Sequence, residues 1–376
     1  MTIKVWDYIE EYEDEKLEIL AAIDKVMHSG RLILGESVKS FEVAFASYCG
    51  VKHGIGVDNA TNGLFLALKA LGIGQGDEVI TVSNTAVPTV CAIVSAGATP
   101  VFVDINPATY LMDTSKLEAL VTPKTKCILP VQLFGQCADM DEISTVAKKH
   151  NLKVLEDCAQ AHGASQKGRK AGSMSDLAVF SFYPTKPLGG YGDGGMVVTD
   201  SDELNAKLRR LRFYGMETNY YAEEHGYNAR LDELHAEILL RKLAHLDRYI
   251  AARSALAERY FHMLCSSSLT LPVVPNDNFH VFYIFVARHP ERDRIVSELK
   301  RRDILLNISY PWPIHMMRGY IYLGYKEGDF PETEKAAREI FSLPMYPKLG
   351  IEDQDKVCEA LGEILSESDR IGMIGK

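Results

Sequence analysis

Residues 177–199 read LAVFSFYPTKPLGGYGDGGMVVT, and this stretch decides how the rest of the chain is interpreted. Short apolar runs rich in Val and Phe open and close it, at 177–182 and 196–199, and predict two buried strands. Lys186 lies between them, flanked by prolines and followed by five glycines that let the backbone bend sharply. A lysine held between two buried strands is poorly solvated, and desolvation favours the free amine, which is a nucleophile.

Three interpretations of this stretch compete. The first is an ordinary glycine-rich hairpin with an exposed lysine. The second is a dinucleotide-binding loop, because Gly190, Gly192 and Gly195 spell GxGxxG. We reject it, since that fingerprint opens a helix whereas these glycines lead into a predicted strand. The third is a lysine that carries pyridoxal phosphate (PLP). This third interpretation requires a carboxylate for the pyridine nitrogen and a phosphate site at a helix N-terminus, both elsewhere in the chain.

Composition and charge argue against several classes of protein. The 376 residues are 47% hydrophobic and 24% charged, which is typical of a globular protein with two domains. A net charge of −10 argues against general affinity for nucleic acid or anionic membranes. Since there is no membrane-length apolar run and no signal peptide, we expect a cytoplasmic protein. The seven cysteines are scattered without a CxxC pair, so we expect free thiols and no metal site.

Strands and helices alternate between residues 53 and 200, and this pattern predicts an α/β fold. Because the strands read as continuous apolar runs, we expect a mostly parallel sheet of seven strands with helices on both faces. Besides the two runs around Lys186, strands are expected at 53–57, 78–82, 99–105, 127–131 and 152–157. Helices are expected at 8–28, 37–48, 62–72, 87–97, 114–121, 140–151, 201–212 and 230–264.

The chain divides into two expected domains. Residues 1–245 would form a large PLP-binding domain with N-terminal helices, and residues 246–376 a smaller α+β domain. The first helix carries apolar side chains at helical spacing, which predicts a buried face on one side and acidic residues on the other. These apolar positions are Ile9, Leu17, Leu20, Ile23 and Met27.

Asp157 is the predicted partner of the pyridine nitrogen. It ends the strand 152–157, and ligands of parallel sheets lie beyond the carboxyl ends of the strands. We expect a helix and a return strand to connect it to Lys186. Gln160 follows closely, and its amide could contact the ring oxygen of the cofactor. His162 is as readily a packed core histidine as a functional one.

The predicted phosphate site is the N-terminus of the helix that follows the strand 53–57. Small and polar residues open this helix, among them Thr61 and Asn62, and free N–H groups with the helix dipole bind anions there. Ser181, five positions before Lys186, could add a hydroxyl to the same phosphate.

Several motifs together resemble those of the DegT-type nucleotide-sugar aminotransferases, which have the type I PLP-dependent transferase fold. The resemblance runs over nearly the whole chain, and its segments are GRLILGESVKSFE, EDCAQAHGA, SFYPTKPLGGYGDGGMVVT, GYNARLDELHAEIL and YPWPIH. It implies a PLP-dependent aminotransferase in which Lys186 binds the cofactor and moves a proton, while Asp157 pairs with the pyridinium. It also implies that Gln160 contacts the ring hydroxyl.

Further roles follow from the resemblance. Ser181 and the backbone at Thr61 and Asn62 would hold the phosphate, and Asn228 would reach it from the neighbouring subunit of a homodimer with shared active sites. Side chains that could contact the nucleotide sugar are Arg31, Tyr183, Arg230 and His315. One position departs from the family, because an aromatic residue often stacks on the cofactor where this chain has Ala86.

The expected reaction transfers an amino group from glutamate to a nucleotide-linked keto-sugar, for deoxyamino sugar and lipopolysaccharide or other glycan biosynthesis. Our preferred substrate is a dTDP-linked 3-keto-6-deoxyhexose, which would give a 3-amino-3,6-dideoxyhexose. A 4-keto-sugar linked to dTDP, UDP or GDP is an alternative. Two others are a sugar dehydratase of the same fold and a regulatory homologue without catalysis. The presence of Lys186 argues against the dehydratase, which has histidine there, and Lys186 with Asp157 argues against the regulatory homologue.

Overall fold

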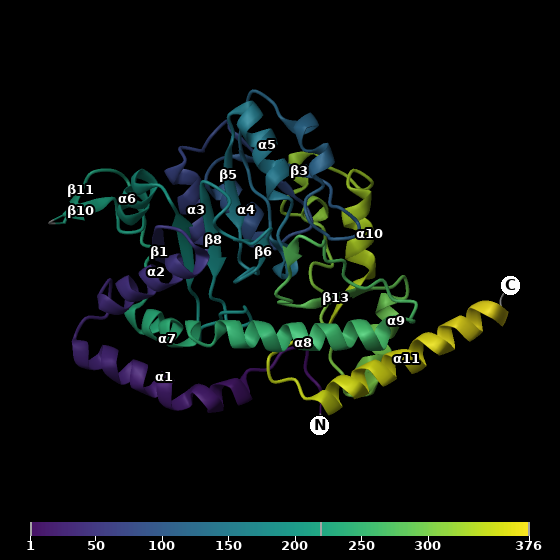
Figure 1. Cartoon of the computed structure of the whole chain (residues 1–376). Helices are drawn as coiled ribbons and strands as arrows, with labels where there is room; N and C mark the ends of the chain where they lie inside the picture. Colours follow the sequence, from purple (N-terminus) through teal and green to yellow (C-terminus); the bar gives the residue numbers. More distant parts are fainter. Residues whose placement is uncertain (1, 219, 375–376) are drawn as a thin grey trace.

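The computed structural model describes residues 2–218 and 220–374, and its centre is a seven-stranded sheet (Figure 1). The strand order is β1-β9-β8-β5-β4-β2-β3. All neighbours from β8 to β3 are parallel, whereas β9 runs antiparallel to both β8 and β1. The predicted mostly parallel α/β sheet is thereby confirmed. The bounds are β1 His53–Val57, β2 Glu78–Val82, β3 Thr99–Val103, β4 Thr125–Ile128, β5 Lys153–Asp157, β8 Leu177–Ser181 and β9 Gly195–Thr199.

Helices cover both faces of this sheet. Since side chains alternate along a strand, Val179 packs with α3 and α4, whereas Phe180 of the same strand packs with α2 and α8. Gly63 of α3 lets this helix approach the sheet, because a Cβ there would lie 2.8 Å from Val179. The helices are α1 Ile9–Ser29, α2 Glu36–Cys49, α3 Ala60–Ala70, α4 Val87–Ser95, α5 Met140–His150, α6 Asp202–Leu211, α7 Glu233–Leu243, α8 Leu246–Leu264, α9 Arg292–Arg301, α10 Pro331–Glu339 and α11 Ile351–Ile374.

A second apolar core lies in the C-terminal region, where α8 crosses beneath the sheet towards α9 and α11 (Figure 1). It packs around the antiparallel pair of β13 (Phe285–Arg288) and β14 (Ile340–Leu343). Three small pairings complete the strands: β6 Ser165–Gln166 with β7 Arg169–Lys170, β12 Asn278–Phe279 with β6, and β10 Met216–Thr218 with β11 Tyr221–Ala222.

Three predicted elements differ from the structure. The segment 114–121 forms two 3-10 turns, Thr114–Lys116 and Glu118–Leu120, in place of one α-helix. The predicted helix 230–264 is two helices, α7 and α8, that meet at Ala244 and His245 through tighter i→i−3 hydrogen bonds. Between Asp157 and β8, the hairpin β6–β7 takes the place of the expected helix.

The predicted buried face of α1 is wrong. The structure buries Ile19, Ala22 and Val26 together with Glu15, and it leaves Leu17 (82%), Leu20 (50%) and Met27 (58%) exposed, while Ile23 is partly buried. The apolar part of this face packs against Ile238 of α7. Glu15 joins it because the buried ammonium of Lys242 on α7 lies 2.7 Å from its carboxylate, and a buried ammonium requires a charged partner.

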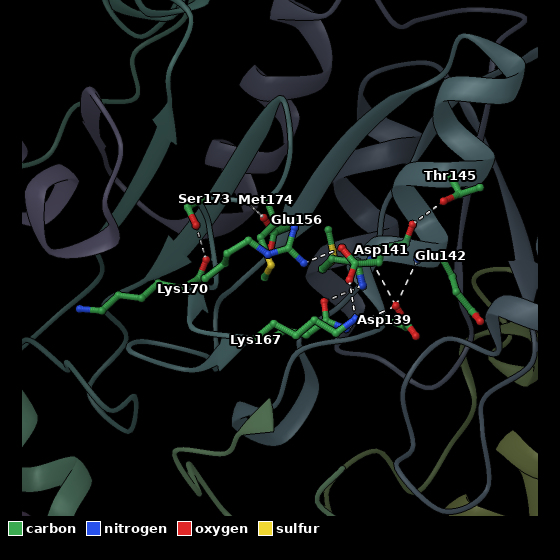
Figure 2. A network of polar contacts seen from close by, with 12 residues as sticks. Asp139, Asp141, Glu142, Thr145, Glu156, Lys167, Lys170, Ser173 and Met174 are labelled. Carbon is green, nitrogen blue, oxygen red and sulfur yellow. Dashed lines mark hydrogen bonds and ion pairs between the residues drawn. The ribbon is translucent and has the colours of Figure 1, made fainter. Parts of the chain in front are cut away.

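A polar network holds the hairpin β6–β7 against α5 and the end of β5 (Figure 2). Asp141 on α5 pairs with Lys167 at 2.8 Å and with Arg169 at 2.6 Å. The fully buried carboxylate of Glu156 accepts hydrogen bonds from the backbone of Met174 and Gly172, each at 3.2 Å. Because Glu156 directly precedes Asp157, this network fixes the end of β5 in the sheet.

Candidate active site

Lys186 lies in a loop that closes the antiparallel strands β8 and β9 at the carboxyl end of β8. Backbone hydrogen bonds of 2.8 Å close the base of this loop, from Phe182 to Gly194 and from Gly190 to Phe182. The Lys186 side chain is half-buried, and its Nζ lies 4.5 Å from the ring centroid of Tyr283. The amine is therefore held over an aromatic face at the strand end.

His235 on α7 fixes the glycine-rich part of this loop. Its Nε2 accepts the Tyr191 N–H at 3.0 Å, and its Nδ1 donates to the Asp193 carbonyl at 2.8 Å. A Cβ on Gly190 would lie 1.9 Å from Nε2, so no other residue fits there without displacement. Burial lowers the pKa of His235, which keeps the ring neutral and able to accept the Tyr191 N–H.

Asp157 lies at the end of β5, the strand next to β8 in the sheet. It is 5% exposed, and its two carboxylate oxygens accept hydrogen bonds from the Thr89 hydroxyl at 2.8 Å and the Ala159 N–H at 3.1 Å. Burial raises the pKa of Asp157, while these two hydrogen bonds and the positive charge of Lys186 lower it. The positive charge of Lys186 thus acts on the Asp157 carboxylate.

Gln160 is engaged at both ends of its amide. Its oxygen accepts the Phe134 N–H at 2.8 Å, and its nitrogen lies 2.6 Å from the Tyr310 hydroxyl. Tyr310 has a left-handed backbone with φ 59°. A second tyrosine, Tyr283, hydrogen-bonds Thr185 at 3.0 Å. Tyr283 therefore contacts the lysine loop, residues 182–194, while Tyr310 contacts Gln160.

The N-terminus of α3 lies beside the start of β9. The Asn59 side chain caps the helix by accepting the Asn62 N–H at 2.8 Å, whereas the Thr61 N–H has no acceptor among the residues that the structure describes. Gly195 allows this approach, because a Cβ there would lie 2.8 Å from the Ala60 nitrogen. Ser181, 8% exposed, ends the neighbouring strand β8.

These positions fit the expected cofactor. Free N–H groups at the start of α3 and the glycine-lined approach of β9 suit a phosphate. The buried Asp157 carboxylate suits a protonated ring nitrogen, and the Lys186 amine suits an aldehyde. No group of three or more His, Cys, Asp or Glu side chains with metal-binding geometry occurs in the described part of the chain.

The tentative substrate residues lie in different places. Arg31 is exposed, and Tyr183 is 52% exposed beside the lysine loop. Arg230 stacks on Phe213 and lines a cavity of about 610 Å³ together with Tyr191 of the loop. Asn228 lies on the surface near the β10–β11 hairpin.

His315 and His162 are both buried in the structure. His315 is 1% exposed, and its nitrogens lie 2.7 Å from the Ser83 hydroxyl and 3.2 Å from the Glu334 carboxylate. This histidine joins the C-terminal region to the end of β2 and is not brought to the surface of the site. His162 is a core histidine, 0% exposed, with its ring against Phe180.

Some residues of the site were missed by the sequence reasoning. Thr89 lies in an apolar helical segment and Tyr283 in an apolar run of the C-terminal region, and neither pattern singles them out. Tyr310 differs from these two residues, because it lies in the YPWPIH segment that carries part of the family resemblance. Ala86, at the start of α4, is half-buried and offers only a methyl group.

No helix among the described residues has both the length and the apolar character needed to cross a membrane.

Relatives match almost the whole chain, as two examples show. The dTDP-3-amino-3,4,6-trideoxy-alpha-D-glucose transaminase of Micromonospora megalomicea subsp. nigra is 56% identical and covers 97% of this chain and 100% of its own length. The Pleiotropic regulatory protein of Geobacillus stearothermophilus is 46% identical and covers 96% and 98%.

Solved structures agree with these relatives. The structure of DesV from S. venezuelae superposes with a TM-score of 0.95 at 42% identity, covering 96% of this chain and 98% of its own. NtdA from Bacillus subtilis, with bound cofactor PMP, gives 0.89 at 32% identity, covering 94% and 82%. These matches confirm the predicted type I PLP transferase fold. Residues 13–362 match the model of one family, and the chain belongs to that family, the DegT/DnrJ/EryC1/StrS aminotransferases.

Proposed function

We propose that this chain is a PLP-dependent aminotransferase that moves an amino group from glutamate to a nucleotide-linked keto-sugar. The observation that carries the proposal is the pairing of a half-buried lysine with a buried carboxylate at the ends of adjacent strands, Lys186 after β8 and Asp157 at the end of β5. The family and the PMP-bound relative support the choice of cofactor.

In this proposal, PLP supplies an electron sink for the carbanion formed at the substrate Cα. The Lys186 amine would move a proton from the glutamate Cα to C4′ of the cofactor in the first half-reaction, and from C4′ to the carbonyl carbon of the sugar in the second. Asp157 keeps a proton on the ring nitrogen, and Gln160 lies near the ring hydroxyl. Ser181 and the free Thr61 N–H at the start of α3 bind the phosphate, and the Asn62 N–H joins them when the phosphate replaces the Asn59 side chain as its acceptor.

For the substrate, we propose a dTDP-linked 3-keto-6-deoxyhexose. The relative from Micromonospora is named for a 3-amino-3,4,6-trideoxy sugar, which supports amination at C3 and a dTDP link. Arg31, Tyr183 and Arg230 remain proposed substrate contacts, because each is accessible to solvent. We no longer include His315, whose ring nitrogens are both engaged within the protein.

We also propose that the protein is cytoplasmic and forms a homodimer. Within each chain, residues 1–245 would form the large domain and residues 246–376 the small domain. Leu17, Leu20 and Met27 expose apolar surface on α1, and burial against a second copy would remove this surface from water. Asn228 lies on the surface, where a neighbouring subunit could receive it. Sedimentation equilibrium measures the mass, and a monomer at all concentrations would contradict the dimer.

A regulatory function is the second candidate, because the relative from Geobacillus is named a pleiotropic regulatory protein. One experiment separates the two candidates. The purified protein, incubated with PLP, is treated with borohydride, and peptide mass spectrometry locates the cofactor. Glutamate is then offered with dTDP- and UDP-linked 3-keto and 4-keto sugars, including 4-deoxy forms, and products are identified by NMR. We expect modification at Lys186 and a 3-amino sugar. Full single-turnover activity of Lys186→Ala would refute the mechanism.

A further inference from the structure

Two buried threonine hydroxyls lead to the Asp157 carboxylate. The Thr85 and Thr89 hydroxyl oxygens lie 2.9 Å apart, and Thr89 donates to Asp157 at 2.8 Å. The two threonines are 1% and 0% exposed, so water does not compete for these contacts. Thr85 follows β2 and Thr89 lies in the first turn of α4, so the two hydroxyls reach Asp157 from the β2–α4 connection.

The direction of donation in this chain is fixed by the chemistry of its members. An ionised carboxylate only accepts hydrogen bonds, so the single hydroxyl proton of Thr89 points to Asp157. The Thr89 oxygen is then left as an acceptor, and Thr85 must donate to it. Hydrogen bonds aligned in this way polarise one another and strengthen the terminal bond to the carboxylate.

We propose that Thr85 and Thr89 are positioning residues that keep Asp157 ionised and aimed at the ring nitrogen of the cofactor. This inference rests on the proposed function. Burial alone favours the protonated acid, and a protonated acid cannot hold a second proton on the ring nitrogen. A hydrogen bond to a charged acceptor is strong, so removing the Thr89 donor has a measurable effect on cofactor binding.

The test measures the PLP affinity of the cofactor-free chain by absorbance titration, with the thermal unfolding midpoint recorded for each variant. Thr89→Val is expected to weaken PLP binding by roughly tenfold to hundredfold, while Thr89→Ser retains the hydroxyl and binds almost as wild type. Thr81→Val is the matched control, because the Thr81 hydroxyl is equally buried but donates to the Leu129 carbonyl at 2.9 Å.

The hydrogen bonds that lead from Thr85 through Thr89 to Asp157 also predict that the effects of substituting the two threonines on PLP affinity are coupled. Thr85→Val is expected to weaken binding by a smaller factor, and this factor should disappear when Thr89→Val is already present, because the effect passes through Thr89. A PLP affinity of Thr89→Val within twofold of the Thr81→Val control would overturn the inference. Independent effects of the two threonines would also overturn it. Wild-type protein that binds no PLP would instead overturn the proposed function, and the inference with it.

Discussion

Replacing His162 by phenylalanine is expected to make the folded chain less sensitive to acid. The imidazole is fully buried among Phe45, Phe180 and Phe182, with ring centroids 5.2 to 6.2 Å away. Within the described ranges no hydrogen bond of normal geometry reaches either ring nitrogen, although the Ser181 backbone lies near enough to favour the protonated ring. Burial, with a contribution from the positive charge of Lys186, lowers the pKa of His162 from 6.5 to about 3.

The sign and size of the effect follow from this pKa. Below pH 6.5 the unfolded chain binds a proton at His162 and the folded chain does not, so stability falls as the pH falls towards 3. Each pH unit in this window lowers the unfolding free energy by about 1.4 kcal/mol. Between pH 6.5 and pH 5, His162 therefore destabilises the wild-type fold by about 2 kcal/mol.

Urea unfolding of the cofactor-free chain at pH 8, 6.5 and 5 measures this difference. His162→Phe should lose about 2 kcal/mol less than wild type between pH 6.5 and pH 5. Burial also lowers the pKa of His280 to about 3, but this residue is present in both proteins, so its contribution to the pH dependence cancels in the comparison. His262→Phe is the control, because that side chain is exposed and should leave the wild-type slope unchanged. Parallel pH profiles of wild type and His162→Phe would refute the reasoning.

Two further predictions concern the loop and the start of α2. Gly190→Ala places a Cβ 1.9 Å from His235, so the lysine loop should shift and the protein should lose most of its PLP affinity. In Gly192→Ala the new Cβ lies 3.6 Å from His235, and this variant should bind PLP normally. Equal PLP affinities of the two variants would contradict this prediction. Glu233 is 2% exposed and accepts backbone N–H groups at the start of α2. Glu233→Ala should destabilise the fold by about 3 kcal/mol in urea, and Glu233→Gln by less; no difference between them would argue against the cap.

The central sheet, and the placement of Lys186 and Asp157 at the ends of adjacent strands, could be predicted from the sequence. Continuous apolar runs identify buried strands wherever helices cover both faces, and polar residues that follow such runs mark the carboxyl edge of the sheet. Lys186 and Asp157 each follow this rule. This rule uses only the order of residues along the chain, so it can be applied without knowing which distant residues are in contact.

Features that depend on distant partners could not be predicted. The face that α1 buries depends on its contacts with α7, such as the pair of Glu15 and Lys242, which are far apart in the sequence and meet only after folding. Thr89 reads as one polar residue in an apolar helix until Asp157 is placed next to it. The tight φ of Tyr310 and its contact with Gln160 likewise arise from packing between the C-terminal region and the sheet.

That packing limits how the enzyme can be re-engineered. Gln160 and Ser83 depend on Tyr310 and His315 for their buried hydrogen bonds. A C-terminal region grafted from another member of the family would therefore leave buried polar groups without partners where it meets the sheet. Chimeras designed to exchange sugar preference have to transfer the residues on both sides of this contact together.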